Sequence, residues 1–423
     1  MARKMKDSGI EWIGEIPEGW EIVPVRSCFD EVRTKNTNGQ EQNALQFKSG
    51  NIISKTNFNA SMDDYVADTI TNYTVVLPDT VMINGLNLNY DFKSLRVALV
   101  KEKGVITSAY LAIFPDRKKI SPQYATYLFK GYETKMAFHN MGAGIRKTLG
   151  YKEFKNQPLL LPSEKEQNKI SAYLDSKCSH IDIMLSKIRS SIEEYKKLKQ
   201  AVITQAVTKG VRGEREMKDS GVEWIGEIPV NWTIQRFARV AEVKSNLVSP
   251  DNYLEYPQIS PENIEKDSGK LLLPCRTVAE VGVISGNHLF YKGQILYSKI
   301  RPKLNKVCIA PFDGLCSADM YPIESKNDTR YIMYCILSNG FLQQVSMITE
   351  NRVKMPKINQ VELSKVLVAI PETIAEQKEI ADYLDAKCAE IDKLIAKKEQ
   401  LVKELESYKK SLIYEVVTGK REV

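Results

Sequence analysis

The stretch MKDSGIEWIGEIPEGW, residues Met5–Trp20, returns as MKDSGVEWIGEIPVNW at Met217–Trp232. The offset between the two copies is 212 residues, and 13 of the 16 positions are identical. A second pair follows at an offset of 210, because EQNKISAYLDSKCSHID (Glu166–Asp182) is echoed by EQKEIADYLDAKCAEID (Glu376–Asp392). The chain is therefore a tandem duplication, and its architecture should contain two related halves.

The segments between the repeated stretches, 22–160 and 233–370, have diverged much further from each other. Both contain short runs typical of strands, separated by turn residues, and each has one run typical of a short helix. The expected strands are Thr74–Leu77, Val81–Ile83, Arg96–Val100, Gln294–Ser298, Lys306–Ala310 and Val366–Ile370, and the expected helices are Tyr124–Phe129 and Tyr331–Leu337. Both segments are predicted to be mixed α/β globular domains.

Each variable segment is followed by a stretch in which apolar residues recur every three or four positions, the spacing of one helix face. These residues are Ile170, Leu174, Ile181, Leu185, Ile188, Ile192 and Tyr195 in the first stretch, and Ile380, Leu384, Ile391, Ile395, Val402, Leu405 and Leu412 in the second. The pairs Ser163/Glu166 and Thr373/Glu376 have the spacing of a capping box at a helix start. Glycines that suit a helix end stand at Gly210 and Gly419.

At 1.5 Å per residue, about 43 residues form a helix of roughly 65 Å, and an apolar stripe of that length must be buried. We expect the two helices to bury their stripes against each other as an antiparallel coiled coil with pseudo-twofold symmetry. The alternative is that each helix packs on its own globular domain. Cys178 and Cys388 occupy matching positions and are expected to be small core residues of the helix pair. The repeated tryptophans, Trp12/Trp224 and Trp20/Trp232, are expected to anchor the junction of domain and helix rather than to stack on bases.

The expected fold class is α+β, with two mixed α/β domains joined by two long helices. The segments are an N-terminal signature (1–21), a first globular domain (22–160), a central helix (161–210), a linker with the repeated signature (211–232), a second globular domain (233–370) and a C-terminal helix (371–423).

Composition narrows the class of protein and the kind of partner. Hydrophobic residues make up 43% of the chain and charged residues 27%, which is typical of a folded soluble protein. No apolar run approaches the roughly 20 residues that cross a bilayer, so we expect no membrane partner and a cytoplasmic location. Seven cysteines without CxxC spacing and three scattered histidines predict reduced thiols and no metal site. The formal charge is +7, and 22–160 and 233–370 carry 18 and 17 Lys/Arg against 12 and 13 Asp/Glu, which favours a polyanionic partner.

Motifs of catalysis and cofactor binding are missing from the sequence. There is no phosphate-binding G-x-x-x-x-G-K-[ST] loop, and the Gly142–Gly144 turn lacks the spacing of a dinucleotide-binding loop. We find no aminomethyltransferase motif and no nuclease-like group of carboxylates. The chain is therefore predicted to be no enzyme and to bind no cofactor itself.

The signature SGIEWIGEIPEGW, its copy, and the P-x-x-x-E-Q-x-x-I-x-x-Y-L-D helix starts closely resemble type I restriction–modification specificity subunits. DTVMINGLNL (Asp79–Leu88) and GQILYSKIRPKLNKVCIA (Gly293–Ala310) resemble two subtypes of that family's target-recognition domain. The resemblance implies that 22–160 and 233–370 each read one half of a bipartite site in double-stranded DNA, and that the helices set the spacing. It further implies two modification subunits, which carry S-adenosylmethionine, and restriction subunits that join them.

Two other classes of function remain open from the sequence: a coiled-coil adaptor that binds proteins but not DNA, and a stand-alone DNA-modifying enzyme of novel motif. The basic variable segments oppose the adaptor, and the missing motifs oppose the enzyme.

Candidate DNA-contacting residues form two clusters in each variable segment. Arg and Lys suit phosphates and guanine edges, and Asn suits adenine edges. The first segment offers Asn84, Asn87, Asn89 and Tyr90, then Arg146 and Lys147; the second offers Lys299, Arg301, Lys303, Asn305 and Lys306, then Asn351, Arg352, Lys354 and Lys357. The alternative interpretation is that these clusters are ordinary solvated loops.

Overall fold

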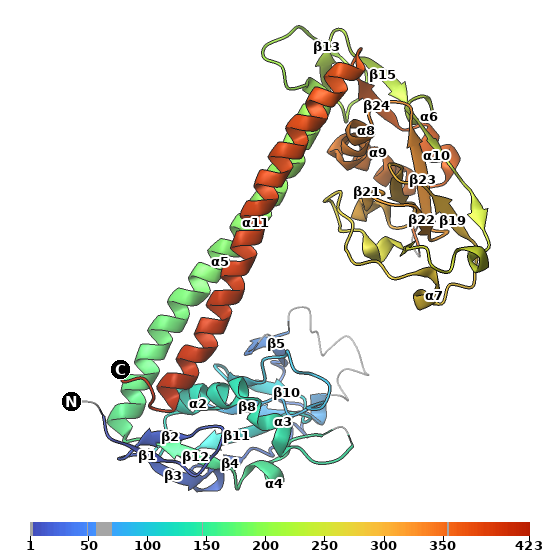
Figure 1. Ribbon diagram of the computed structural model, residues 1–423. Helices are drawn as coiled ribbons and strands as arrows, with labels where there is room; N and C mark the ends of the chain where they lie inside the picture. The colour runs from blue at the N-terminus through green and yellow to red at the C-terminus, as the bar shows by residue number, and fades with distance from the viewer. Residues whose placement is uncertain (1–2, 49, 56–69, 146, 353–354) are drawn as a thin grey trace. The chain divides into compact units, whose positions relative to one another are not determined.

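The computed structural model describes residues 3–48, 50–55, 70–145, 147–352 and 355–423 (Figure 1). It divides into two compact units, of which unit 1 comprises Met1–Ile188 with Gln400–Val423 and unit 2 comprises Arg189–Glu399. Each unit contains one variable segment and part of both long helices, α5 (Glu164–Lys209) and α11 (Ile374–Val417). Both helices were predicted from their apolar stripes and are confirmed.

Residues 22–160, called domain 1 below, are built on a four-stranded antiparallel sheet. The strand order is β4 (Phe29–Glu31), β11 (Leu111–Pro115), β8 (Val81–Ile83) and β9 (Val97–Leu99). Alternate residues of a strand face opposite sides of a sheet. Val81 and Ile83 therefore join the core that contains helix α2 (Pro122–Thr134), whereas Met82 joins a second core on the opposite face.

Residues 233–370, called domain 2 below, contain a sheet of the same order although the sequences have diverged. This order is β16 (Ala241–Val243), β23 (Met320–Ser325), β20 (Ile295–Ser298) and β21 (Val307–Ile309). Alternation recurs as well, because Ile295 and Tyr297 face the core with helix α8 (Thr329–Leu337), and Leu296 faces the second core. The duplication predicted from the flanking repeats thus extends into the divergent segments.

Smaller elements complete each domain. The six strands expected from the sequence all overlap observed strands, and the two expected helices overlap α2 and α8. In domain 1 the remaining elements are β3 (Glu21–Pro24), β5 (Leu45–Lys48), β6 (Asn51–Ser54), β7 (Thr74–Val76), β10 (Gly104–Ile106), β12 (Pro158–Leu161), α3 (Ala137–Met141) and α4 (Tyr151–Phe154). In domain 2 they are β15 (Thr233–Arg236), β17 (Leu247–Val248), β18 (Gln258–Ile259), β19 (Asn287–Phe290), β22 (Gly314–Cys316), β24 (Leu367–Ile370), α6 (Phe237–Val240), α7 (Val278–Val281), α9 (Asn339–Thr349) and α10 (Gln360–Ser364). The two signatures form the hairpins β1–β2 (Met5–Asp7, Glu15–Pro17) and β13–β14 (Met217–Asp219, Glu227–Pro229).

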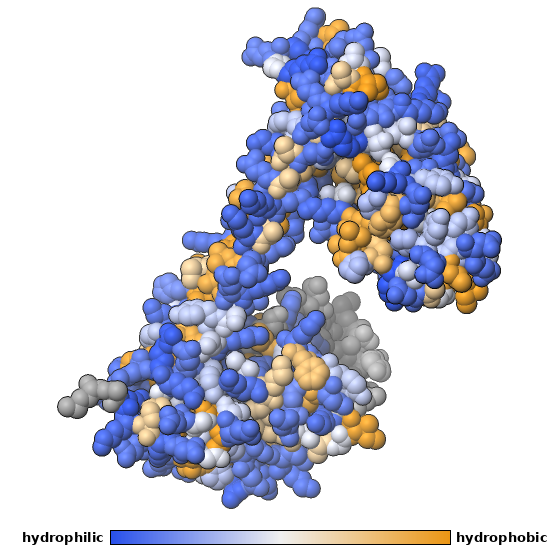
Figure 2. Space-filling view, viewed as in Figure 1, coloured by the Kyte–Doolittle hydropathy of each residue, from blue (hydrophilic) through white to orange (hydrophobic). Residues whose placement is uncertain are grey.

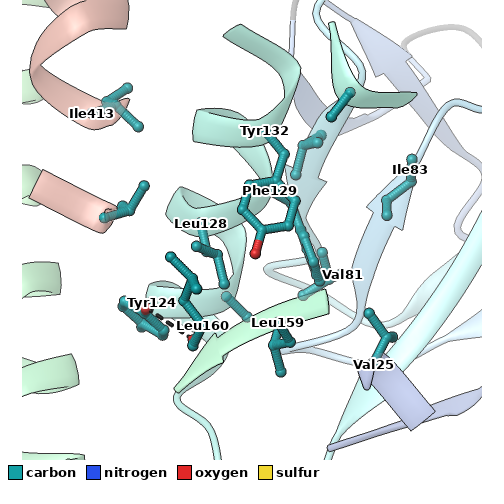
Figure 3. Packing of buried hydrophobic residues seen from close by; sticks show 14 of the residues in the cluster. Val25, Val81, Ile83, Tyr124, Leu128, Phe129, Tyr132, Leu159, Leu160 and Ile413 are labelled. Carbon is teal, nitrogen blue, oxygen red and sulfur yellow. Dashed lines mark hydrogen bonds between the residues drawn. The ribbon is translucent and has the colours of Figure 1, made fainter. Parts of the chain in front are cut away.

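Helix α2 links the domain 1 sheet to the long helices of unit 1. Figure 3 shows α2 between the sheet and the end of α11, with Phe129 directed toward Val81 and with Ile413 on the α11 side. The Tyr124 hydroxyl donates a hydrogen bond to the Leu160 carbonyl over 3.1 Å, which ties α2 to β12. One continuous apolar core therefore holds domain 1 on the helices of unit 1.

Within each unit, the start of one long helix lies beside the end of the other. In unit 1, Lys409 Nζ contacts the Asp182 carboxylate at 2.6 Å, and in unit 2, Lys199 Nζ contacts Asp392 at 2.9 Å. These two ion pairs are equivalent, because Asp182 and Asp392, like Lys199 and Lys409, are separated by the repeat offset of 210 residues. The buried Cys178 and Cys388 belong to the cores of units 1 and 2, as predicted, and burial raises the pKa of the Cys388 thiol to about 11.

Each junction between a signature and a long helix is organised by a tryptophan and a glutamate. The Trp20 indole donates to Glu166 at 2.9 Å, and the Trp232 indole donates to Glu376 at 3.2 Å. An arginine completes both sites, since Arg3 pairs with Glu166 and Arg215 with Glu376. Trp20 and Trp232 are therefore core anchors, as predicted.

The capping-box prediction needs a correction at the glutamates. The hydroxyl half of the pattern is present at Thr373, which accepts from Glu376 N over 3.2 Å. The carboxylates of Glu166 and Glu376, however, accept hydrogen bonds from the tryptophans and arginines of the junctions. Tertiary partners thus use the side chains that local spacing had assigned to the helix end.

Candidate nucleic-acid interface

The candidate clusters lie on equivalent loops of the two sheets. In domain 1 the loop between β8 and β9 (84–96) opens with Asn84 N donating to Arg96 O over 2.8 Å. In domain 2 the loop between β20 and β21 (299–306) is closed by Ser298 N donating to Lys306 O over 2.9 Å. These bonds align the loops residue by residue at both ends, so each is the same hairpin connection with a different length and sequence. We call them the central loops.

A second loop, called the flanking loop, lies against each central loop and carries the other candidate cluster. In domain 1 (142–149), Leu149 N donates to Gly85 O over 2.9 Å, and Leu88 N donates to Lys147 O over 3.1 Å. Domain 2 (351–358) repeats the first bond, because Ile358 N donates to Lys299 O over 2.9 Å, and has a similar second bond one residue earlier in the central loop, where Arg301 N donates to Pro356 O over 2.7 Å. The structure therefore brings the two candidate clusters of each domain together.

The predicted residues of domain 1 differ in how much they offer to solvent. Asn87, Tyr90 and Lys147 are exposed, while Asn84 and Asn89 are half-buried. Asn84 Oδ1 accepts from Leu86 N over 3.2 Å, and Asn89 Nδ2 donates to Ile145 O over 3.0 Å, so these two amides also support the loops. The predicted Arg146 lies outside the described residues.

The predicted residues of domain 2 divide in the same way. Arg301, Lys303, Asn351 and Lys357 are exposed. Three others are engaged within the domain: Lys299 Nζ lies 5.2 Å from the Tyr321 ring centroid, Lys306 Nζ donates to Pro261 O, and Arg352 pairs with Glu362. Asn305 is buried, and its amide donates to Leu337 O over 3.3 Å, so its side chain supports the loop from below. The predicted Lys354 lies outside the described residues.

Charged groups around the loops are fixed in their ionised forms. Hydrogen bonds from Ser94 and Lys93, together with the nearby charge of Arg96, lower the pKa of Asp91 to about 2. The hydrogen bonds that Glu362 accepts from Arg352 raise the pKa of that guanidinium and lower the pKa of the carboxyl. Asp91, Glu362 and Arg352 are thus held in their ionised forms at neutral pH.

Sequence reasoning missed two residues of the domain 1 loop. Phe92 is exposed and stacks on the His139 ring, with centroids 5.1 Å apart and planes 11° from parallel. Arg96 was assigned to the start of a strand, yet its guanidinium is buried and bonded to three carbonyls of the central loop. An exposed aromatic after Tyr90 was a readable signal, whereas the burial of an arginine was not.

The residues that the structure describes form neither a metal-binding cluster nor a membrane-spanning helix. They contain no cluster of three or more His, Cys, Asp or Glu side chains that could hold a metal ion. Nor does this part of the chain include a helix with the length and apolarity to cross a bilayer. Figure 2 shows a predominantly hydrophilic surface on the visible face, with hydrophobic residues scattered over it.

Comparison with known proteins bears on the family. Residues 229–404 match the family model described as the type I restriction modification DNA specificity domain. The chain is 36% identical over 276 residues to the EcoDI type I restriction enzyme specificity subunit of Escherichia coli, a match that covers 62% of this chain and 61% of that one. It is 24% identical to the putative MjaX specificity subunit of Methanocaldococcus jannaschii, over 96% of this chain and 95% of that one. The chain is therefore similar to type I restriction–modification specificity subunits, at low identity over nearly its whole length and at higher identity over about three fifths of it.

A solved structure also shares the fold of this chain. That structure, titled as the structural basis of complex assembly and conformational transition of the type I R-M system, superposes with a TM-score of 0.68. The match covers 96% of this chain and 99% of that chain at 13% sequence identity, so it supports the fold alone. The mixed α/β architecture with long helices is therefore one that this chain shares with a solved structure.

Proposed function

We propose that this chain reads a bipartite sequence in double-stranded DNA for a type I restriction–modification complex, with one half-site for each domain. The observation that carries the proposal is the repeated pair of central and flanking loops. Both domains hold these loops with similar backbone hydrogen bonds, yet the side chains on them differ. Two readers of one design with different surface chemistry suit a site whose two halves differ in sequence.

The exposed chemistry of the loops suits duplex DNA. Domain 1 presents Asn87, Tyr90 and Lys147, and domain 2 presents Arg301 and Lys303. Phosphate contacts from Lys and Arg provide affinity, and amide or guanidinium contacts to base edges provide sequence discrimination. We assign the target-recognition domains to 22–160 and 233–370.

The two long helices serve in this proposal as an antiparallel coiled coil that sets the spacer between the half-sites. The equivalent pairs Asp182–Lys409 and Lys199–Asp392 support it, because each pair joins one helix to the other. Their relation by the repeat offset is what a pseudo-twofold pair of helices requires. The helices at 161–210 and 371–423 would also dock two modification subunits.

We further propose that the chain itself has no catalytic activity. The modification subunits would bind S-adenosylmethionine and transfer the methyl group, and restriction subunits would join the same assembly. The similarity to specificity subunits and the missing catalytic motifs in the sequence support this assignment of roles.

The test is an exchange of residues 22–160 for the equivalent segment of another specificity subunit, followed by sequencing of the sites methylated by the assembled complex. The expected result is a change in one half-site, with the other half and the spacer unchanged. Alteration of both halves would contradict independent reading by the two domains. A complex that binds modification subunits but shows no salt-dependent, sequence-specific DNA binding would instead support the coiled-coil adaptor.

A further inference from the structure

The central loop of domain 1 is wrapped around one buried arginine. Arg96 is 1% exposed, although arginine is almost never fully buried without partners. Its Nη1 donates to the carbonyls of Asn84 and Leu86, both over 2.9 Å, and its Nη2 donates to Asp91 O over 2.5 Å. A single planar fork thus fixes three points along one side of the loop.

Contacts from α2 and α3 hold the remaining part of the loop. The Arg96 backbone N–H donates to the Glu133 carboxylate on α2. His139 of α3 has its Nε2 3.2 Å from Asp91 O, and its ring supports the exposed ring of Phe92. The loop is therefore held by α2 at Arg96 and by α3 at Asp91 and Phe92, while the neighbouring Tyr90 is 72% exposed.

Stability alone is a poor explanation for this arginine. The nearest carboxylate oxygen of Asp91 is 3.7 Å from Nη2, and Nε has no partner among the described residues. Burying a guanidinium without a close ion pair and with an unsatisfied donor is costly. What the arrangement provides is one fixed conformation of a surface loop, and a preorganised loop loses less entropy on binding.

Domain 2 offers an internal comparison. The residue equivalent to Arg96 is Lys306, since the carbonyl of each accepts a hydrogen bond from the N–H of the residue that opens the hairpin connection. Lys306 Nζ donates to Pro261 O, outside the central loop. The buried arginine that binds carbonyls of its own central loop is therefore a feature of domain 1, and its removal should affect one half-site only.

We propose that Arg96 is the positioning residue for DNA recognition by domain 1, holding the central loop so that Tyr90 and Phe92 meet the duplex in a fixed orientation. This inference rests on the proposed function. These exposed aromatic rings can pack on sugar and base edges, while the exposed Lys93 of the same loop and Lys147 of the flanking loop contact phosphates. Recognition then depends on a side chain that itself touches no DNA.

The experiment uses the full chain assembled with its modification subunit. Binding is measured to three duplexes: the cognate site, and sites with one base pair changed in either half. The half-site of domain 1 is identified by the segment exchange described above. Wild-type complex should discriminate by roughly 5- to 150-fold per changed base pair in either half. Equal binding of the wild-type complex to all three duplexes would contradict the proposed function itself.

Arg96→Lys keeps the charge and most of the stem but loses the planar fork. We expect discrimination in the domain 1 half-site to fall to about threefold or less, with discrimination in the other half-site retained. The control is Arg117→Lys, a half-exposed arginine of the same domain paired with Asp79, which should leave both half-sites unchanged. Equal loss in both half-sites, or no loss in either, would overturn the proposal.

Tyr90→Ala separates positioning from general destabilisation, because the ring is exposed and its removal should not affect folding. Tyr90→Ala alone should weaken discrimination in the domain 1 half-site, and should add little to Arg96→Lys in the double variant. Additive losses, or a Tyr90→Ala variant that discriminates like the wild type, would each refute the assigned role. Where Arg96→Lys fails to fold, the single Tyr90→Ala variant decides, because discrimination equal to that of the wild type would exclude from recognition the ring that Arg96 is proposed to position.

Discussion

The two signature junctions provide an internal experiment on the energetics of a buried ion pair. Glu376 is 2% exposed, and it accepts from Arg215 Nη1 over 2.5 Å and from the buried Trp232 indole over 3.2 Å. Glu166, its counterpart, has the equivalent partners Arg3 and Trp20 but is 25% exposed. The chemistry of the two sites is the same, so their difference in burial can be tested directly.

Glu376→Ala should cost about 3–5 kcal/mol, because it removes the carboxylate that pairs with a mostly buried guanidinium and leaves a buried indole N–H without an acceptor. Glu166→Ala should cost only about 1 kcal/mol, because water can reach the groups that lose their partner. Glu376→Gln is the matched control, since its amide oxygen can still accept from Trp232. Its cost should lie between those of the two alanine variants.

Because the chain has two compact units, global unfolding is not assured to be two-state, and a local measurement is preferable. Hydrogen exchange of peptides covering 217–236 and 5–24 reports each junction separately. A loss of about 3 kcal/mol accelerates exchange through local opening by roughly 150-fold, and 1 kcal/mol by roughly fivefold. Similar acceleration at both junctions would refute the argument from burial.

Three further predictions concern other contacts. Burial raises the pKa of Glu133 to about 7, so its contribution to the free energy of unfolding is present at low pH and lost as pH rises through 7. Denaturant titrations should therefore show Glu133→Gln to be more stable than wild type by about 1–3 kcal/mol at pH 8. At pH 5 the variant should have little advantage. Asp392→Asn should cost about 2 kcal/mol, against less than about 1 kcal/mol for the more exposed Asp182→Asn, because Lys199 is nearly buried; melting curves of the two variants test this order. Matched insertions of four residues after Lys187 and after Lys397 add roughly 6 Å per helix and turn it only about 40° beyond a full turn. Methylated sites should therefore gain one or two base pairs of spacer. Insertions of two residues instead rotate the apolar stripe by about 200° and should prevent assembly. An unchanged spacer in a methylating four-residue variant would exclude the helices as the ruler.

The sequence predicted those features whose signal is local or repeated. Periodic apolar residues predicted α5 and α11, and recurrence at matching positions predicted that Trp20 and Cys178 belong to cores. The contacts that shape the loops join residues far apart in sequence, and no periodicity reports them. Arg96 looked like the first residue of a strand, and Asn305 looked like an exposed loop amide, because neither sequence context reveals the carbonyls that these side chains bind.

The linker between the halves also makes contacts that the sequence did not predict. Residues 209–216 carry no apolar period and were expected to be a simple connection. In the structure, however, Arg212 donates to Glu379 over 2.7 Å and Arg215 donates to Glu376 over 2.5 Å. The charges of this connection therefore hold the chain against the start of α11, which charge composition alone could not distinguish from solvation.

The distribution of contacts explains how the loops of the two domains can diverge while the long helices stay alike. The Lys199–Asp392 and Asp182–Lys409 pairs each join a residue of the first repeat to a residue of the second, so a change in one copy must be matched in the other. The contacts between central and flanking loops, in contrast, stay within one domain, and they use backbone atoms that survive a change of side chain. Substitutions on a loop surface therefore alter neither the opposite domain nor the helix pair. Under the proposed function, the reading of one half-site could therefore change without the other, because sequence-independent backbone contacts hold the loops and exposed side chains provide the discrimination.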